Sequence, residues 1–231
     1  MNNPKYALVT GASRGIGRAI AERLEKEGAK LFLICHKDVH SLEPLSGTHF
    51  AGDIGDFEFV SNVINSMPRI DYLINNAGIS KIGLLQDMTP SEWDEIVKTN
   101  LTSLYNTCHA AIPKMIHQKY GKIINISSAW GNVGASTEVA YSATKGGVNA
   151  FTRALAKELA PSNIQVNAIA CGVIDTDMNK CFDEEERQAL IDEIPACRMG
   201  TPDDVAELVS SLVSGNSYLT GQIIGLDGGW I

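Results

Sequence analysis

Residues 6–17 decide the fold of this chain, and they read Tyr-Ala-Leu-Val-Thr-Gly-Ala-Ser-Arg-Gly-Ile-Gly. The apolar run 6–10 predicts a buried strand, and the spacing of apolar residues over 15–27 predicts an amphipathic helix. The glycines between them permit a tight turn and a close approach of the backbone to an anion, to which the helix N-terminus presents free N–H groups. A strand, a glycine-rich turn and a helix in this order predict a phosphate-binding turn, although its spacing is G-x-x-x-G-x-G and not G-x-G-x-x-G.

The same alternation of short apolar runs and longer helical patterns continues along the chain. Further strands are expected at 30–35, 49–52, 72–75, 122–127, 165–170 and 222–226. Further helices are expected at 57–67, 90–118 (with a kink at Pro113), 140–159, 184–194 and 202–213. Strands that are apolar throughout and alternate with helices predict an α/β fold, a single doubly wound (Rossmann) parallel sheet with helices on both faces.

Composition places the chain among single-domain globular proteins. Its 231 residues are 44% hydrophobic and 20% charged, which fits one domain over 1–231. The net charge of −8, with no dense Lys/Arg run, argues against nucleic acid and membrane partners. Five scattered cysteines indicate free thiols and no metal site. With no secretory leader and no apolar stretch of about 20 residues, a cytoplasmic location is expected.

The end of the second expected strand bears on which dinucleotide binds. An NAD enzyme of this architecture usually carries a carboxylate there to bind the ribose 2′-hydroxyl. This chain has Cys35, His36 and Lys37, and the glycine turn adds Ser13 and Arg14. These cations favour a 2′-phosphate, so NADP(H) is the predicted cofactor. NAD(H) stays an alternative because an aspartate, residue 38, follows directly.

A second group of residues predicts proton transfer. Tyr141 and Lys145 are four residues apart at the start of the expected helix 140–159, so they share one face. A neighbouring ammonium lowers the pKa of a phenol and makes it a better acid–base group near neutral pH. Ser128 follows the expected strand 122–127 at the carboxyl edge of the sheet, where its hydroxyl can donate to a carbonyl oxygen that gains negative charge.

On these motifs the chain resembles the short-chain dehydrogenase/reductase family over essentially its whole length. The matching segments are the glycine turn 10–17, Asn75-Asn76-Ala77-Gly78, Asn100 within Lys98-Thr99-Asn100-Leu101, Ser128, Tyr141 and Lys145. The resemblance implies NADP(H)- or NAD(H)-dependent oxidation and reduction at a CH–OH or C=O group.

The resemblance also implies roles for single residues. Tyr141 would be the general acid in reduction, Lys145 would lower its pKa and bind the nicotinamide ribose, Ser128 would orient the carbonyl, and Asn100 would hold a water of the proton relay. The implied cofactor-binding residues are Gly11, Ser13, Arg14, Gly15, Ile16, Gly17, His36, Lys37, Asp53, Ile54, Asn75, Ala77, Gly78, Tyr141, Lys145, Ile174 and Thr176. For Asn75 and Asn100, bracing of the backbone is an equal alternative.

One position departs from the family pattern. Cys171-Gly172 stands where the family commonly has Pro-Gly, so a thiol is expected near the nicotinamide end. We expect a buried, inert thiol in a slightly softer loop. The connection over about 175–200 is expected to form the lid over the substrate.

Within the family, the chain is most similar to bacterial beta-ketoacyl-[acyl-carrier-protein] reductases, which implies an acyl-thioester substrate and a homotetramer or homodimer. For an acidic carrier protein the sequence offers Lys119 and Lys122, but Ser162-Asn163 where a further arginine is expected. The alternative is a polyol, sugar or hydroxysteroid dehydrogenase. A non-enzymatic NADP(H)-binding sensor is a third reading, disfavoured by the complete Ser128, Tyr141 and Lys145 set.

Overall fold

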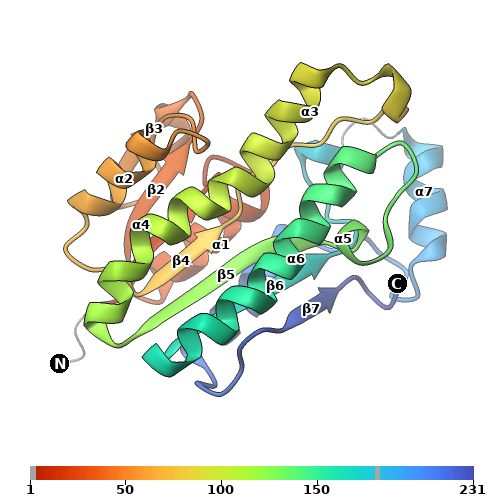
Figure 1. Ribbon diagram of the computed structural model, residues 1–231. Helices are drawn as coiled ribbons and strands as arrows, with labels where there is room; N and C mark the ends of the chain where they lie inside the picture. Colours follow the sequence, from red (N-terminus) through yellow and green to blue (C-terminus); the bar gives the residue numbers. More distant parts are fainter. Residues whose placement is uncertain (1–3, 180–182) are drawn as a thin grey trace.

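The computed structural model of the chain describes residues 4–179 and 183–231, and its centre is a parallel β-sheet (Figure 1). The strands are β1 (Tyr6–Thr10), β2 (Lys30–Cys35), β3 (Thr48–Ala51), β4 (Tyr72–Asn75), β5 (Gly121–Ser128), β6 (Ile164–Cys171) and β7 (Ile223–Leu226). They form one seven-stranded sheet in the order β3-β2-β1-β4-β5-β6-β7. All neighbouring pairs are parallel, so the carboxyl ends of the strands meet at one edge.

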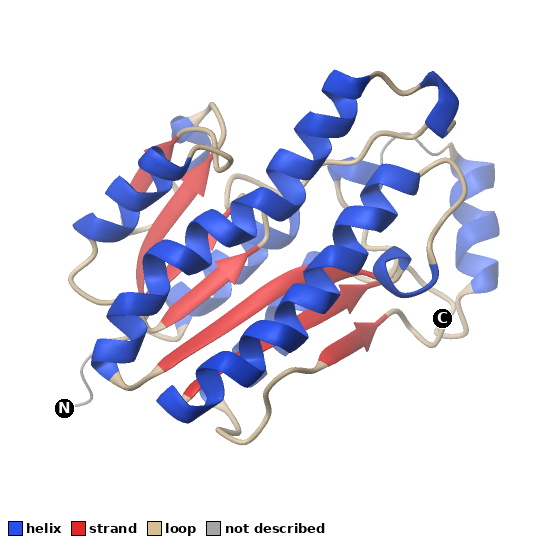
Figure 2. Ribbon diagram, viewed as in Figure 1, coloured by secondary structure: helices blue, strands red, loops and turns tan. Residues whose placement is uncertain are grey.

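Helices cover both faces of this sheet (Figure 2). They are α1 (Gly15–Lys26), α2 (Phe57–Ser66), α3 (Pro90–Val97), α4 (Ser103–Gln118), α5 (Trp130–Val133), α6 (Val139–Leu159), α7 (Glu184–Glu193) and α8 (Pro202–Ser214). One face is covered by α2, α4 and α6 and the other by α1 and α8. In the described part of the chain, no helix is both long and apolar enough to cross a membrane.

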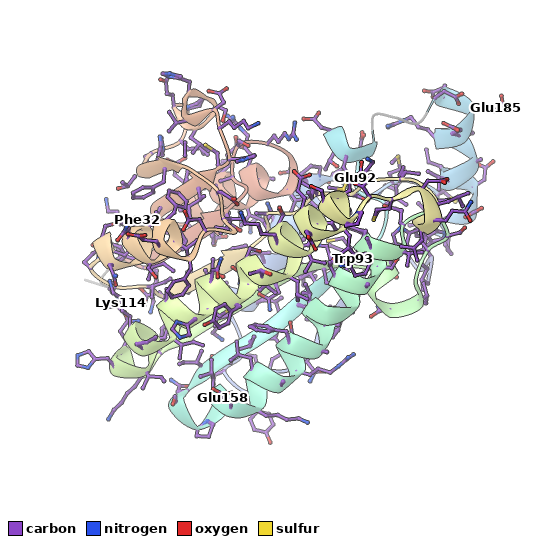
Figure 3. All side chains as sticks on the ribbon, turned by 45° about the horizontal axis from the view of Figure 1, so that its top comes forward. Phe32, Glu92, Trp93, Lys114, Glu158 and Glu185 are labelled. Atoms are coloured by element: carbon purple, nitrogen blue, oxygen red, sulfur yellow. The ribbon has the colours of Figure 1, made fainter. Side chains whose placement is uncertain are left out.

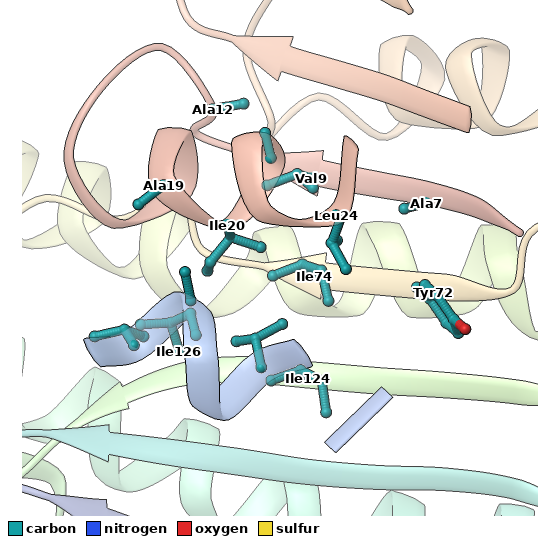
Figure 4. Close-up of a cluster of buried hydrophobic side chains, with 14 of the residues drawn as sticks. Ala7, Val9, Ala12, Ala19, Ile20, Leu24, Tyr72, Ile74, Ile124 and Ile126 are labelled. Atoms are coloured by element: carbon teal, nitrogen blue, oxygen red, sulfur yellow. The ribbon is translucent and has the colours of Figure 1, made fainter. Parts of the chain in front are cut away.

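The hydrophobic core has two halves because successive residues of a strand point to opposite faces. In β1, Ala7 and Val9 pack with Ile20 and Leu24 of α1 (Figure 4), whereas Leu8 packs on the other side. All of these side chains are almost completely buried. The two halves hold the sheet between its helix layers, and the carboxyl edge of the sheet carries the functional residues.

The doubly wound parallel sheet predicted from the sequence is confirmed. Most boundaries agree within one residue, as in β3, which begins one residue earlier than expected. The sequence pattern missed the short helix α5 and the 3₁₀ turn Val39–Leu42, because one turn of helix is too short to show a period. Cys181 and the first three residues, 1–3, lie outside the described residues.

The single helix predicted over 90–118 is wrong in one respect. A π-helical turn, Lys98–Thr102, separates α3 from α4, and Asn100 lies within it. Pro113, where a kink was expected, lies inside α4, which continues to Gln118. A π-helical turn leaves backbone and side-chain groups free to bind elsewhere and often marks a functional position.

Candidate active site

In the glycine turn after β1, Gly17 is packed too closely for a side chain. A Cβ on Gly17 would lie 2.3 Å from the carbonyl oxygen of Gly11 and 2.4 Å from Nδ2 of Asn76. Gly11 and Gly15 have φ values of +66° and +54°, the left-handed region that favours glycine. The sequence therefore uses glycine here both for backbone conformation and for close packing.

Asn76 and Thr10, for which the sequence predicts no individual role, hold this turn against β4. Asn76 donates from Nδ2 to the carbonyl oxygens of Thr10 (3.0 Å) and Gly11 (3.2 Å). The Thr10 hydroxyl accepts from the backbone N–H groups of Asn76 and Ala77, both at 3.0 Å. The motif contained both asparagines, but only the alternation of side chains along a strand would have indicated that Asn75 and Asn76 point in opposite directions.

The N-terminus of α1 suits a phosphate. Its N-cap residue Arg14 makes no side-chain cap hydrogen bond, so the first N–H groups of the helix are not capped by that residue. The Arg14 guanidinium is exposed and lies 3.6 Å from the carboxylate of Asp177. Ser13, Gly15 and Ile16 of the same turn are half-buried. These residues form a cradle that fits the pyrophosphate of a dinucleotide. A side chain in place of Gly17 would close it.

The residues after β2 are placed at the same edge. Cys35 is buried, and His36 and Lys37 are exposed. Asp38 caps the 3₁₀ turn, since its Oδ1 accepts from the backbone N–H of His40 at 3.1 Å. In an NAD enzyme, Asp38 would bind the ribose 2′-hydroxyl. One oxygen of its carboxylate already accepts this backbone hydrogen bond.

The predicted adenine-side residues form a small polar group. Lys98 Nζ lies 2.7 Å from Oδ2 of Asp53, and this contact is the main cause that lowers the pKa of the Asp53 carboxyl. Gly55 N–H donates to the other oxygen at 2.7 Å. Ile54 is nearly buried, and its carbonyl oxygen accepts from Asn106 Nδ2 at 3.2 Å.

Asn75 lies in the core, with 4% of its surface exposed. Its Nδ2 donates to Oδ1 of Asn125 at 2.9 Å, and its Oδ1 accepts from the hydroxyl of Thr107 at 2.7 Å. These bonds tie β4 to β5 and α4. The hydrogen bonds of the Asn75 side chain therefore fit the bracing alternative. Ala77 and Gly78, which follow it in the chain, are half-buried.

Replacing Asn75 with alanine should test bracing against cofactor contact. We expect the free energy of unfolding to fall by about 1–3 kcal/mol, because the buried partners Asn125 and Thr107 lose hydrogen bonds. The dissociation constant of the dinucleotide should change less than threefold. Urea unfolding and NADPH fluorescence titration measure the two quantities. A large loss of affinity at unchanged stability would contradict the bracing role.

Asn100 reaches from the π-helical turn to the loop after β4. Its Oδ1 accepts from the N–H of Ile79 and its Nδ2 donates to the carbonyl of Ile79, both at 2.8 Å. Nδ2 also lies 3.2 Å from the hydroxyl of Thr144. A Cβ on Gly78 would be 3.4 Å from Oδ1 of Asn100 and 3.6 Å from Nζ of Lys145, so both groups border the same small space.

The three central residues come together at the carboxyl edge from different elements. Tyr141 and Lys145 lie on the first turns of α6, with Lys145 Nζ 5.4 Å from the centre of the Tyr141 ring. Ser128 ends β5 and forms a side-chain hydrogen bond with Tyr141. The Ser128 oxygen accepts from the N–H of Trp130 at 3.2 Å, which leaves its proton for another acceptor. Lys145 Nζ donates to the carbonyl of Ile126 at 2.8 Å.

The expected lowering of the Tyr141 pKa is wrong for the protein by itself. Burial raises the pKa of Tyr141 above its ordinary value, and the hydrogen bond with Ser128 only partly opposes this. Burial also lowers the pKa of Lys145 to about 8. The physical reason is that removal from water disfavours the charged form of both groups, so that near neutral pH Tyr141 holds its proton.

Cys171 ends β6 directly beside Ser128, its partner in the sheet. The thiol is buried, which raises its pKa to about 12, so it stays protonated. Its carbonyl oxygen accepts from the N–H of Ala129 at 2.8 Å. These contacts favour the inert thiol. Across 4–179 and 183–231, no three His, Cys, Asp or Glu side chains are grouped to hold a metal ion.

The segment expected to form the lid is anchored at both ends. Ile174 pairs with Gly200 as an isolated parallel bridge, and Thr176 packs against Gly15 of the phosphate turn. The C-terminal Trp230 reaches the same region, because its ring lies 5.0 Å from that of Trp130 and its Nε1 donates to a carboxylate on α7. No local pattern in the sequence indicates this contact between Trp230 and the residues after Ser128.

The structure contradicts the prediction that Lys119 and Lys122 border the active site and contact a carrier protein. Lys122 is 3% exposed, and its Nζ donates to the carbonyl oxygens of Gly215 and Asn216 after α8. Lys119 and Asn163 contact one another at the same end of the sheet. This end is the amino edge, because β5 begins at Gly121 and reaches the site only at Ser128. In one protomer these residues therefore cannot form the rim of its own site.

A serine, tyrosine and lysine at the carboxyl edge beside a phosphate turn define an oxidoreductase that acts on CH–OH or C=O groups with a nicotinamide cofactor. The chain belongs to the short chain dehydrogenase family, whose model matches residues 5–187.

Individual relatives span nearly the whole chain. Nodulation protein G of Azospirillum brasilense is 39% identical and covers 97% of both chains. The 3-oxoacyl-[acyl-carrier-protein] reductase of Aquifex aeolicus is 39% identical, over 97% of this chain and 96% of that protein. The ligand-free structure of Thermoplasma acidophilum aldohexose dehydrogenase matches with a TM-score of 0.92 at 32% identity, over 99% of this chain and 94% of that one.

Proposed function

We propose that the protein is an NADP(H)-dependent carbonyl reductase whose substrate is a 3-oxoacyl thioester. The placement of Tyr141, Lys145 and Ser128 at one edge of the sheet carries the reaction class. Similarity to 3-oxoacyl-[acyl-carrier-protein] reductases over nearly the full chain supports the substrate class.

In this proposal each residue has one task. The bound nicotinamide cofactor supplies the hydride that a carbonyl carbon receives. Ser128 donates a hydrogen bond to the carbonyl oxygen, and Tyr141, protonated near neutral pH, gives its phenolic proton to that oxygen to complete the alcohol. Lys145 lies beside the phenol and stabilises the phenolate that remains until a proton returns from solvent past Asn100.

The preference for NADP(H) rests on charge. His36 and Lys37 are exposed after β2, Arg14 is exposed at the N-terminus of α1, and the Asp38 carboxylate is partly used as a cap. A 2′-phosphate would form an ion pair with the guanidinium of Arg14, which lies beside Asp177 in this structure. We also propose a cytoplasmic location, where the four cysteines that the structure describes would remain as free thiols.

The direct test is a turnover assay with NADPH and NADH. We expect reduction of acetoacetyl-pantetheine with NADPH, and kcat/KM at least tenfold lower with NADH. Arg14→Ala should reduce this preference, because it removes one cation from the 2′-phosphate. Absorbance at 340 nm reports every reaction. A clear NADH preference would overturn the cofactor proposal, and turnover of polyols or sugars alone would overturn the substrate proposal.

A sugar dehydrogenase is the second candidate, favoured by the structural similarity to the aldohexose dehydrogenase. Polyol and hydroxysteroid oxidation belong to the same alternative and use the same residues in the opposite direction. A binding protein without turnover is disfavoured, because such a protein would have no need of Ser128, Tyr141 and Lys145 together.

We also infer that the chain forms a homotetramer or homodimer through the outer faces of α4 and α6. Tyr105 (52% exposed) and Ile116 (45% exposed) lie on α4, and exposed small residues such as Ala150 and Ala154 lie on α6. The two helices lie side by side over the sheet (Figure 1). Apolar side chains on two adjacent helices are a common protein interface.

A further inference from the structure

An acidic side chain that the mechanism does not use lies near the catalytic tyrosine. Glu138 is the N-cap residue of α6 and precedes Tyr141 by three positions. Its Oε1 accepts a hydrogen bond of 2.5 Å from the hydroxyl of Ser80, on the loop that follows Gly78. This Ser80–Glu138 pair joins the loop after β4 to the start of the catalytic helix.

The backbone fixes Glu138 in this place. The preceding Thr137 has a φ of +64°, a conformation that β-branched residues rarely adopt. Its carbonyl oxygen accepts from the N–H of Gly83 at 2.8 Å, and the carbonyl of Glu138 accepts from the N–H of Ser142 at 2.8 Å. Backbone strain of this kind persists where surrounding contacts determine the conformation, and it is found at functional sites.

The charge of Glu138 has no counter-ion in the parts of the chain that the structure describes. The nearest lysine along the loop, Lys81, pairs with Glu92 instead. The half-buried carboxylate is therefore held by a neutral hydroxyl. The negative charge of Glu138 also acts on the catalytic phenol. Burial is the largest cause of the raised pKa of Tyr141, and the charge of Glu138 raises this pKa further.

We propose that Glu138 makes the site select neutral carbonyl substrates against anionic ones. This inference rests on the proposed carbonyl reduction and narrows its substrate class. A substrate carboxylate next to the reacting carbonyl would meet the negative charge of Glu138, which has no ion-pair partner among residues 4–179 and 183–231. An ester or thioester at the same position carries no charge and meets no such repulsion.

Ethyl acetoacetate and acetoacetate form a matched pair, because they differ in an ester against a carboxylate. The ratio of their kcat/KM values should favour the ester in the wild-type enzyme. In Glu138→Gln, which keeps the size and an acceptor for Ser80, the ratio should fall about tenfold or more, since charges within ~8 Å are only partly screened. Glu158→Gln is the control, because Glu158 lies at the far end of the same helix (Figure 3) and should leave the ratio unchanged.

A second readout separates a charge effect from a structural one. Removing the Glu138 charge should lower the pKa of Tyr141, so the acid limb of the oxidation rate should move to lower pH in Glu138→Gln. The other groups that face Tyr141 are Lys145 on α6, Ser128 on β5 and Cys171 on β6, and the variant leaves them intact. In the wild type, added salt should raise kcat/KM for the anion and leave the ester unaffected, a test that needs no variant.

An unchanged ratio in Glu138→Gln, together with salt-independent rates for the anion, would overturn the proposal. Failure of the proposed function looks different. If the acetoacetate pair is not reduced but an aldohexose is oxidised, the reductase proposal fails. The ratio of the kcat/KM values for glucose and glucuronate, measured in the same variants, then tests the charge selection.

Discussion

Replacing Tyr141 with phenylalanine is expected to lower kcat by about 10²–10⁴-fold, the range that a general acid contributes. The phenol is the proton donor at the catalytic edge, and burial keeps it protonated near neutral pH. Phenylalanine fills the same volume and removes only the hydroxyl. Ser128 keeps its contact with the N–H of Trp130, so the fold should be preserved. Stopped-flow and steady-state rates with NADPH measure the loss.

Two comparisons make this result specific. The dissociation constant of NADPH should change by less than a factor of three, because the variant leaves intact both the phosphate turn at the start of α1 and Lys145 on α6. Tyr218→Phe is the control, since Tyr218 is 94% exposed and should retain full activity. Activity of Tyr141→Phe within tenfold of the wild type would contradict the assigned role.

Replacing Gly17 with alanine, which adds a single methyl group, is expected to weaken cofactor binding strongly. The new Cβ would lie 2.3 Å from the Gly11 carbonyl oxygen, which is itself held by Asn76. Because that neighbour is backbone, the turn must open, and we expect at least a hundredfold loss of NADPH affinity. Overpacking should also reduce the free energy of unfolding by about 1–3 kcal/mol.

Fluorescence titration with NADPH and thermal unfolding measure these two effects. Gly83→Ala is the matched control, because a Cβ on Gly83 meets nothing within 4 Å and its φ is ordinary. That variant should bind NADPH and unfold as the wild type does. Affinity within threefold of the wild type in Gly17→Ala would show that the turn tolerates a side chain, against the packing described above.

The proton-transfer residues could be predicted from the sequence because each is local to a regular element. Tyr141 and Lys145 share a helix face by their spacing alone, and Ser128 lies at a strand end that the apolar run 122–127 locates. Their pKa values could not be predicted. Whether an ammonium lowers the pKa of a phenol or burial raises it depends on how much water the surrounding elements exclude, and here burial dominates.

Contacts between residues far apart in the chain could not be predicted from the sequence. The Ser80–Glu138 pair links residues 58 positions apart, and the Trp130 and Trp230 rings meet from segments far apart along the chain. The surroundings of Lys122 could not be predicted either, because only the packing of the segment after α8 against the start of β5 shows that its ammonium is buried and bonded to Gly215 and Asn216. Distances between elements depend on packing, for which a single sequence holds no direct pattern.

The sequence by itself determined the parallel doubly wound sheet, the phosphate turn and the serine, tyrosine and lysine of the site, because the periodicity of side chains and the conformational freedom of glycine are local properties. The tertiary structure alone decided that Asn76, and not Asn75, holds the turn of residues 10–17, that a π-helical turn presents Asn100, and that a carboxylate stands beside Tyr141. These features arise where elements distant in sequence exclude water and face one another.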